Sequence, residues 1–235
     1  MNPVDRSNDF SALSTSKKLL LLASNALPAT QVAAAIAAAC WPGLSFVPRI
    51  SLVLAIVYLV PPIACRLMKG VLQPMEGRIP VGSRSFFAWW MMLQAQMIFL
   101  RLPFLEELIR FVPGLYSLWL RCWGSRIGRL TYWAPGLTIH DRAYLDIGDD
   151  VVFGAGVRLT PHVLRVETDG SWLYLGTIRI GSGASIGGYA LLSSGCEVGA
   201  NEQTHAYLIL PPFAKWHGGR RFREIRRIAA AAREA

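Results

Sequence analysis

The chain has 235 residues, of which 53% are hydrophobic and 17% charged, and its mean hydropathy of +0.35 is high for a soluble protein. Lysine and arginine outnumber aspartate and glutamate by 24 to 15, which gives a formal net charge of +9. The basic residues lie beside apolar segments rather than in a recognition motif, so nucleic-acid binding is not favoured. Four widely spread cysteines exclude a disulfide framework and a paired-cysteine metal site.

The first 70 residues are predicted to form a short tail and a membrane hairpin. After a tail over 1–18, the apolar run 19–41 is long enough to span a bilayer. A second apolar run, 50–65, follows a turn and is slightly short for a straight span, and its two consecutive prolines are expected to kink it. We therefore predict a transmembrane helical hairpin over 19–70.

Basic residues flank both ends of this hairpin and set its predicted orientation. Lys17 and Lys18 precede the first run, and Arg66 and Lys69 close the second. The positive-inside rule puts both ends in the cytoplasm, which predicts a protein of the bacterial inner membrane with its remaining residues on the cytoplasmic side. A signal peptide over 17–34 is the alternative, although the apolar run continues past any such cleavage point.

Residues 71–126 are predicted to form amphipathic helices in the headgroup zone of the membrane. Within them, 84–124 is dense in tryptophan and phenylalanine, with arginines interspersed, and two prolines divide it into short helices. Tryptophan and arginine at this density suit helices that lie at a membrane surface. A second interpretation, compatible with the first, is that these helices pack on the base of the domain that follows.

An aliphatic or aromatic residue at every sixth position is the most informative pattern in the chain. A period of six fits neither an α-helix nor a flat strand. It fits a three-sided coil in which each face takes six residues and the sixth points inward, with glycine at the corners. The sequence therefore predicts a parallel β-helix over 127–214, with a β-sandwich as the alternative. The residues expected to point inward are Ile127, Trp133, Ile139, Leu145, Ile147, Phe153, Leu159, Ile180, Ile186, Leu192 and Val198.

The six-residue pattern is interrupted once, between Leu159 and Ile178, and the interruption contains His162. A loop that leaves a coil is where a side chain can face a ligand instead of the core. The other histidines are expected to be surface residues, and His140 in particular to face solvent or a neighbouring subunit. The four histidines include no pair five residues apart, so a metal hydratase on the same fold is disfavoured and we predict no metal site.

Three blocks of the sequence, in order, resemble the hexapeptide-repeat acyltransferases, whose domain is a left-handed parallel β-helix. They are IGDDVVFGAGVRL with His162 just after it, TIRIGSGASIGGYALLSSGCEVGAN, and LPPFAKWHGGRRFREIRR. The resemblance covers about residues 125–230, and the hairpin would make this chain a membrane-anchored variant. The chain departs from the family pattern at Gly156, where an asparagine is common, and after Gly219, where Asn-Pro is usual.

This resemblance implies transfer of an acyl group, such as acetyl, from a coenzyme A or carrier-protein thioester to a hydroxyl or amine near the membrane. His162 would be the general base, because imidazole titrates near neutral pH. Asp141 and His205 would bind substrate, and the alternatives for Asp141 are that it orients a histidine or is a solvated turn carboxylate. Glycine amides would hold the oxyanion and basic side chains the donor phosphates. The implied donor contacts are Gly187, Gly188, Ser193, Ser194, Lys215, Arg220 and Arg221.

The resemblance also implies a homotrimer with active sites between subunits. Its expected partners are the bilayer and, where the donor is a carrier-protein thioester, an acyl carrier protein, and no permanently bound cofactor is expected. Residues 215–235 are rich in helix-forming residues and arginine, which predicts a basic C-terminal helix. It would cap the β-helix, face anionic lipid or contact donor phosphates. A non-catalytic scaffold that uses the β-helix only to assemble membrane hairpins is the alternative function.

Overall fold

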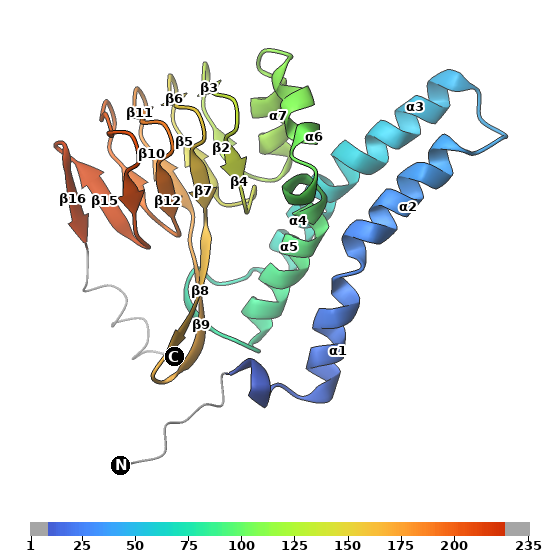
Figure 1. Cartoon of the computed structure of the whole chain (residues 1–235), viewed down its shortest axis with the longest axis horizontal. Coiled ribbons are helices and arrows are strands. Elements are labelled where there is room, and N and C mark those ends of the chain that lie inside the picture. The colour runs from blue at the N-terminus through green and yellow to red at the C-terminus, as the bar shows by residue number, and fades with distance from the viewer. Residues whose placement is uncertain (1–8, 224–235) are drawn as a thin grey trace.

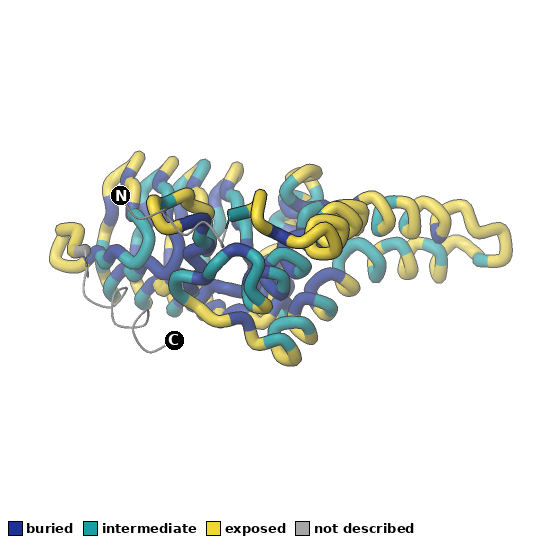
Figure 2. Tube along the Cα trace, turned by 90° about the horizontal axis from the view of Figure 1, so that it is seen from below, coloured by how far each residue is buried: buried dark blue, intermediate teal, exposed yellow. Residues whose placement is uncertain are grey.

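The computed structural model describes residues 9–223, and the helices come first along the chain, at one end of a stack of short strands (Figure 1). The N-terminal helices form a long hairpin that projects away from the strands, and most of its surface is exposed or half-buried (Figure 2). The hairpin consists of α1 (Thr15–Ser24), α2 (Leu27–Ala39), α3 (Phe46–Leu54), the π-helical turn η2 (Ala55–Leu59) and α4 (Val60–Leu72).

Two continuous helical stretches in this hairpin, Thr15–Ala39 and Phe46–Leu72, are long and apolar enough to cross a membrane by length and composition. Only 6% and 17% of their most apolar windows are buried, whereas a core helix of a soluble protein would be mostly buried. The predicted kink site, Pro61 and Pro62, directly follows the π-helical turn. Proline has no N–H to donate, and the residues just before the pair form the wider, i to i+5 hydrogen-bonding pattern of a π-helix.

The aromatic-rich segment forms three helices that pack on the first coil of strands: α5 (Arg84–Arg101), α6 (Phe104–Arg110) and α7 (Leu115–Cys122). Trp89, Phe99 and Trp123 are fully buried, so packing on the base of the strand domain is confirmed. Contact with lipid stays a prediction. It concerns a set of large apolar side chains that α6, α7 and their flanks leave exposed, namely Leu102, Phe104, Leu108, Phe111, Val112, Leu115 and Leu118.

The strands form three parallel sheets, one for each face of a coil. The first face consists of β2 (Arg126–Ile127), β5 (Leu145–Ile147), β10 (Ile178–Ile180), β13 (Glu197–Val198) and β15 (Ala214–His217). The second consists of β3 (Tyr132–Trp133), β6 (Val152–Phe153) and β11 (Ser185–Ile186), and the third of β4 (Thr138–Ile139), β7 (Arg158–Thr160), β12 (Leu191–Ser193) and β14 (Ile209–Leu210). The chain visits the faces in turn, so each coil lies on the one before it.

The strand register confirms the six-residue pattern and shows that the β-sandwich alternative is wrong. Ile127 pairs with Ile147, Ile147 with Ile180, and Ile180 with Val198, which stacks these side chains inside the coils. All the predicted inward residues are buried except Trp133, which is half-buried and stacks on Phe153. At the corner glycine Gly154 a Cβ would lie 2.5 Å from the amide nitrogen of Gly188 in the next coil, so only glycine fits there.

The interruption between the second and third coils is a β-hairpin rather than an irregular loop. It is formed by β8 (His162–Glu167) and β9 (Gly170–Leu175), and β1 (Gly77–Pro80), from the segment before α5, adds to the free edge of β9. This places the start of the hairpin, His162, between the coils and the helices.

The predicted C-terminal helix is wrong for residues 215–223, and its remainder, 224–235, lies outside the described residues. β15 turns back into β16 (Arg220–Arg223) as an antiparallel hairpin. Gly218 and Gly219 both have positive φ, of 58° and 68°, which suits a tight turn and not a helix. The free edge of β13 also offers β15 a strand partner, and this pairing overrides local helix propensity.

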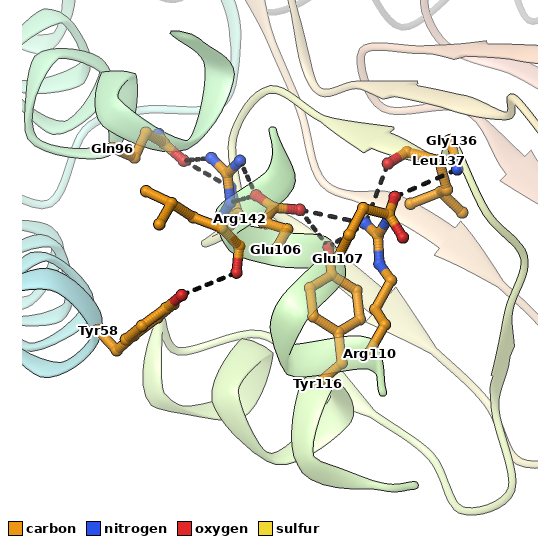
Figure 3. Close-up of polar contacts among 10 residues, drawn as sticks. Tyr58, Gln96, Glu106, Glu107, Arg110, Tyr116, Gly136, Leu137 and Arg142 are labelled. Atoms are coloured by element: carbon orange, nitrogen blue, oxygen red, sulfur yellow. Dashed lines mark hydrogen bonds and ion pairs between the residues drawn. The ribbon is translucent and has the colours of Figure 1, made fainter. Parts of the chain in front are cut away.

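A buried polar cluster attaches α5 and α6 to the first coil (Figure 3). Arg142, between β4 and β5, is 1% exposed, and its Nε donates to Oε1 of Glu106 over 2.6 Å. Its amide N and its Nη1 each donate to Gln96 Oε1 over 3.0 Å. The Tyr116 hydroxyl donates to Glu106 Oε2 over 2.6 Å, and Arg110 Nη2 to the Leu137 carbonyl over 3.0 Å. The helices therefore hold the corner that follows β4 in a fixed position.

Candidate active site

His140, Asp141 and His162 lie at the same edge of the third face, one coil apart. β4 and β7 pair in parallel, with Ile139 opposite Leu159. His140 and Asp141 directly follow Ile139, and His162 is the third residue after Leu159. The coil therefore brings together side chains that are about 20 residues apart in the sequence.

The side chains of Asp141 and His162 form a directly hydrogen-bonded pair. His162 Nδ1 contacts Asp141 Oδ2, and the second carboxylate oxygen, Oδ1, accepts a 3.0 Å hydrogen bond from Trp89 Nε1 on α5. The Trp89 ring also packs on the imidazole with 4.8 Å between ring centroids. Asp141 is 1% exposed and both of its oxygens are engaged, so the solvated-turn interpretation of this residue is wrong, and its geometry is that of a group that orients His162.

The bond to Asp141 fixes which nitrogen of His162 is free to take a proton. A carboxylate only accepts, so Nδ1 carries the hydrogen and Nε2 keeps the lone pair in the neutral ring. Burial acts to lower the pKa of His162, but the charge of Asp141 and its hydrogen bond outweigh burial, and the net pKa is raised above 6.5. The side chain is 17% exposed, so the ring is not completely enclosed.

His140 does not face open solvent, one of the two positions that the sequence predicted, and its contact with a neighbouring subunit stays a prediction. It is half-buried, and its ring centroid lies 5.9 Å from that of His162. Burial, and then the charge that His162 carries when protonated, lower the pKa of His140. The pKa of His162 is thus raised and that of His140 is lowered, so His162 holds a proton more readily than His140 does.

Replacing Asp141 with asparagine is expected to lower the pKa of His162, because the group that opposes the effect of burial is lost. The raised folded-state pKa means that the wild-type pair stabilises the fold fully below about pH 6.5, and that this contribution is lost as the pH rises through the folded pKa. Histidine NMR titration of the full chain in detergent measures both pKa values. Asp150→Asn, at an exposed corner with φ of 56°, is the matched control and should leave the titration unchanged. An unshifted midpoint in Asp141→Asn would show that the pair does not set the pKa.

The predicted oxyanion residues lie at a different corner of the coil. Gly187 and Gly188 connect β11 to β12, between the second and third faces. The Gly187 N–H already donates to Thr204 Oγ1 over 2.9 Å, and a Cβ on Gly187 would lie 2.4 Å from the carbonyl carbon of His205. His205 is exposed beside this corner. Within one chain these residues are therefore on the opposite edge of the third face from His162.

The other predicted donor contacts are divided between two places. Ser193 and Ser194 lie at the same edge of the third face as His162, one coil further on, but both are buried. Lys215 lines a hollow of about 480 Å³ on the first face, and its Nζ is 3.2 Å from Glu197 Oε2. Arg220 and Arg221 lie on β16, at the far end of that face. A single chain thus does not gather the donor contacts around His162.

Sequence reasoning missed Trp89 and did not favour the pairing of Asp141 with His162. The pairing had a signal, because Asp141 and His162 follow equivalent inward residues of neighbouring coils. The role of Trp89 had none, since it depends on how α5 docks against the coils. Among the described residues, no group of three histidine, cysteine, aspartate or glutamate side chains is arranged to hold a metal ion.

No family model and no curated protein sequence matches the chain. Several acetyltransferases are among the solved structures similar to it. A maltose O-acetyltransferase from Clostridium difficile 630 is 17% identical with a TM-score of 0.38, over 52% of this chain and 83% of that one. A hexapeptide-repeat acetyltransferase from Vibrio cholerae is 17% identical with a TM-score of 0.38, over 54% of this chain and 89% of that one. A soybean serine acetyltransferase is 19% identical with a TM-score of 0.25, over 84% and 70%. Because these sequence identities and TM-scores are low, the assignment of a β-helix depends on the strand register described above.

Proposed function

We propose that the chain is a membrane-bound acyltransferase of the hexapeptide-repeat type, with a left-handed β-helix. It moves an acyl group from a coenzyme A or carrier-protein thioester to a hydroxyl or amine of an acceptor near the bilayer. The observation that carries this proposal is the Asp141–His162 pair, which lies at the one interruption of the coils among the described residues. A partly exposed imidazole with a fixed tautomer is what a general base requires.

The reaction follows from the free Nε2 of His162. This nitrogen takes the proton of the acceptor as the acceptor oxygen or nitrogen attacks the thioester carbonyl carbon. The new carbon–oxygen or carbon–nitrogen bond forms, the carbon–sulfur bond breaks, and the protonated imidazole returns its proton to the leaving thiolate. Asp141 stabilises the transient imidazolium and keeps the ring oriented. Because the Gly187 N–H is engaged by Thr204, we assign the oxyanion contact to Gly188.

The quaternary structure in this proposal is a trimer with each active site between two subunits. Its support is the separation of the predicted groups within one chain. Gly188 and His162 flank the third face at its two edges, and Lys215 belongs to the first face. A neighbouring subunit that packs its edge against the first would bring a donor groove to His162.

The membrane placement in this proposal has the helical hairpin in the bilayer and the coils on the cytoplasmic side. Its support is the low burial of the two apolar stretches together with the exposed apolar side chains of α6 and α7. Trp89 of α5 donates a hydrogen bond to Asp141, so the helices that follow the hairpin contact the proposed catalytic pair directly. An acceptor held at the bilayer surface would then reach His162 from the helix side.

Mass spectrometry of lipid extracts tests the proposal. Cells that express the wild-type chain are expected to contain a lipid, or a lipid-linked compound, with an added acyl mass that is absent when His162→Asn is expressed at the same level. Identical lipid profiles, combined with no release of thiol from acyl-coenzyme A by the purified protein, would contradict it.

A non-catalytic membrane scaffold is the second candidate, and it has its own support. Ser193 and Ser194 are buried, and the Gly187 N–H is engaged, so within residues 9–223 of one chain these three predicted donor contacts are not open to a donor. Equilibrium binding of acetyl-coenzyme A to the assembled protein separates the two candidates. The scaffold predicts no binding at millimolar donor concentration.

A further inference from the structure

A basic hollow lies beside α4, at the end of the helical hairpin, and neither Asp141 nor His162 lines it. Its volume is about 540 Å³, and it is formed where α4, α7 and the first coil meet. Arg66 of α4, Arg121 of α7 and Arg126 of β2 all line it. These three arginines come from separate elements and are brought together only by the fold.

Two of the three arginines are held in place by backbone carbonyls. The Arg121 guanidinium donates from Nε to the Ile127 carbonyl over 2.9 Å and from Nη2 to the Gly128 carbonyl over 3.1 Å. Arg66 Nη1 lies 3.4 Å from the Arg121 carbonyl oxygen, which keeps the second guanidinium beside the first. A guanidinium group that is already oriented loses less conformational entropy when it binds a ligand.

The positive charge of this hollow is not neutralised within residues 9–223. None of the three arginines forms an ion pair with a carboxylate of the described chain, whereas Arg78, Arg110 and Arg142 all do. Asp149 also lines the hollow, but its Oδ1 already accepts the Arg129 N–H over 2.6 Å. Asp146 faces Arg126 across the strand pair without an ion pair between them. Three arginines against these two carboxylates leave the site net positive.

We propose that this hollow is a binding site for a phosphate group. Guanidinium forks match the oxygens of phosphate, and several of them converging on one hollow favour a dianion or a diester over a single carboxylate. The position of Arg66 near the end of Phe46–Leu72 puts the site where the second long apolar helical stretch meets the coils. The proposal is independent of acyl transfer, since none of its arginines contacts Asp141 or His162 among the described residues.

A binding titration with inorganic pyrophosphate tests the site. The full chain is kept in an uncharged maltoside detergent, and the variants are Arg66→Gln and Arg126→Gln, which leave the hydrogen bonds of the Arg121 guanidinium to Ile127 and Gly128 intact. Each is expected to weaken binding by about 10-fold, since a hydrogen bond to a charged group is lost. Arg101→Gln, an exposed arginine at the end of α5 that does not line the hollow, is the matched control and should bind like the wild type.

The source of the phosphate is resolved by a second arm of the experiment. Native mass spectrometry of the protein released from nanodiscs of phosphatidylglycerol and phosphatidylcholine reports whether a phospholipid stays bound. Lipid retained by the wild type and Arg101→Gln, but lost in Arg66→Gln and Arg126→Gln, identifies a headgroup. Pyrophosphate binding without selective lipid retention identifies a soluble phosphate compound. Equal pyrophosphate binding by all variants, or binding by none, would overturn the proposal.

Discussion

His162→Asn is expected to remove acyl transfer while leaving the coils folded. Asparagine can still donate a hydrogen bond to Asp141 but has no group that takes a proton near neutral pH. Loss of a general base lowers the rate by about 10²- to 10⁴-fold. The release of thiol from acetyl-coenzyme A, with a membrane lipid extract as the acceptor, measures this loss.

The matched control for this variant is His217→Asn. His217 is at the end of β15 with a side chain that is 78% exposed, so its replacement removes one histidine without touching the Asp141–His162 pair. We expect its rate to stay within about twofold of the wild type, in line with the small effect of most surface substitutions. A His162→Asn rate above a tenth of the wild-type rate, in a protein with an unchanged circular dichroism spectrum, would remove His162 from its catalytic role.

The coils were predictable from sequence because their signal is local. Each inward side chain, such as Ile147 or Ile180, recurs at a spacing set by the length of one face, and the sequence records that spacing directly. The apolar hairpin was predictable for a similar reason, since the length of an apolar run decides whether it can span a bilayer. Both features depend on residues that are neighbours in the chain.

The parts that sequence reasoning missed depend on how separate elements meet. Asp141 and Trp89 are 52 residues apart, and only the docking of α5 on the first coil places the indole N–H on the carboxylate. The C-terminal residues have good helix propensity, but the two-glycine turn at Gly218 and the free edge of β13 make strand pairing more favourable. The donor contacts came from a resemblance, which gives their order along the chain but not which corner of the coil they face.

Glu106→Gln is expected to destabilise the whole protein strongly, because it leaves a buried arginine without its countercharge. The side chains of Glu106 and Arg142 are 5% and 1% exposed, and they form an ion pair between α6 and the first coil (Figure 3). Removing one partner of a buried ion pair costs about 3–5 kcal/mol. Tyr116 adds to this cost, since its hydroxyl donates to the same carboxylate. Burial, and then the charge of Glu106, raise the pKa of Tyr116, so the phenol stays neutral and remains a donor.

Glu107→Gln is the internal control for this prediction. Glu107 is the next residue of α6 and also pairs with Arg110, with 2.5 Å between Oε1 and Nη1, but its side chain is 39% exposed. Arg110 is buried but keeps its second carboxylate partner, with 3.1 Å between Nη2 and Glu106 Oε2, so we expect a loss closer to the roughly 0–1 kcal/mol of an exposed ion pair. The free energy of unfolding of the full chain in detergent, measured by denaturant titration for both variants, separates the two cases. Equal losses would mean that burial of the Glu106–Arg142 pair has no energetic consequence. A large loss in Glu106→Gln alone, accompanied by weaker acyl transfer, would show that this cluster holds the corner carrying Asp141 in place, since Arg142 is its immediate neighbour in the chain.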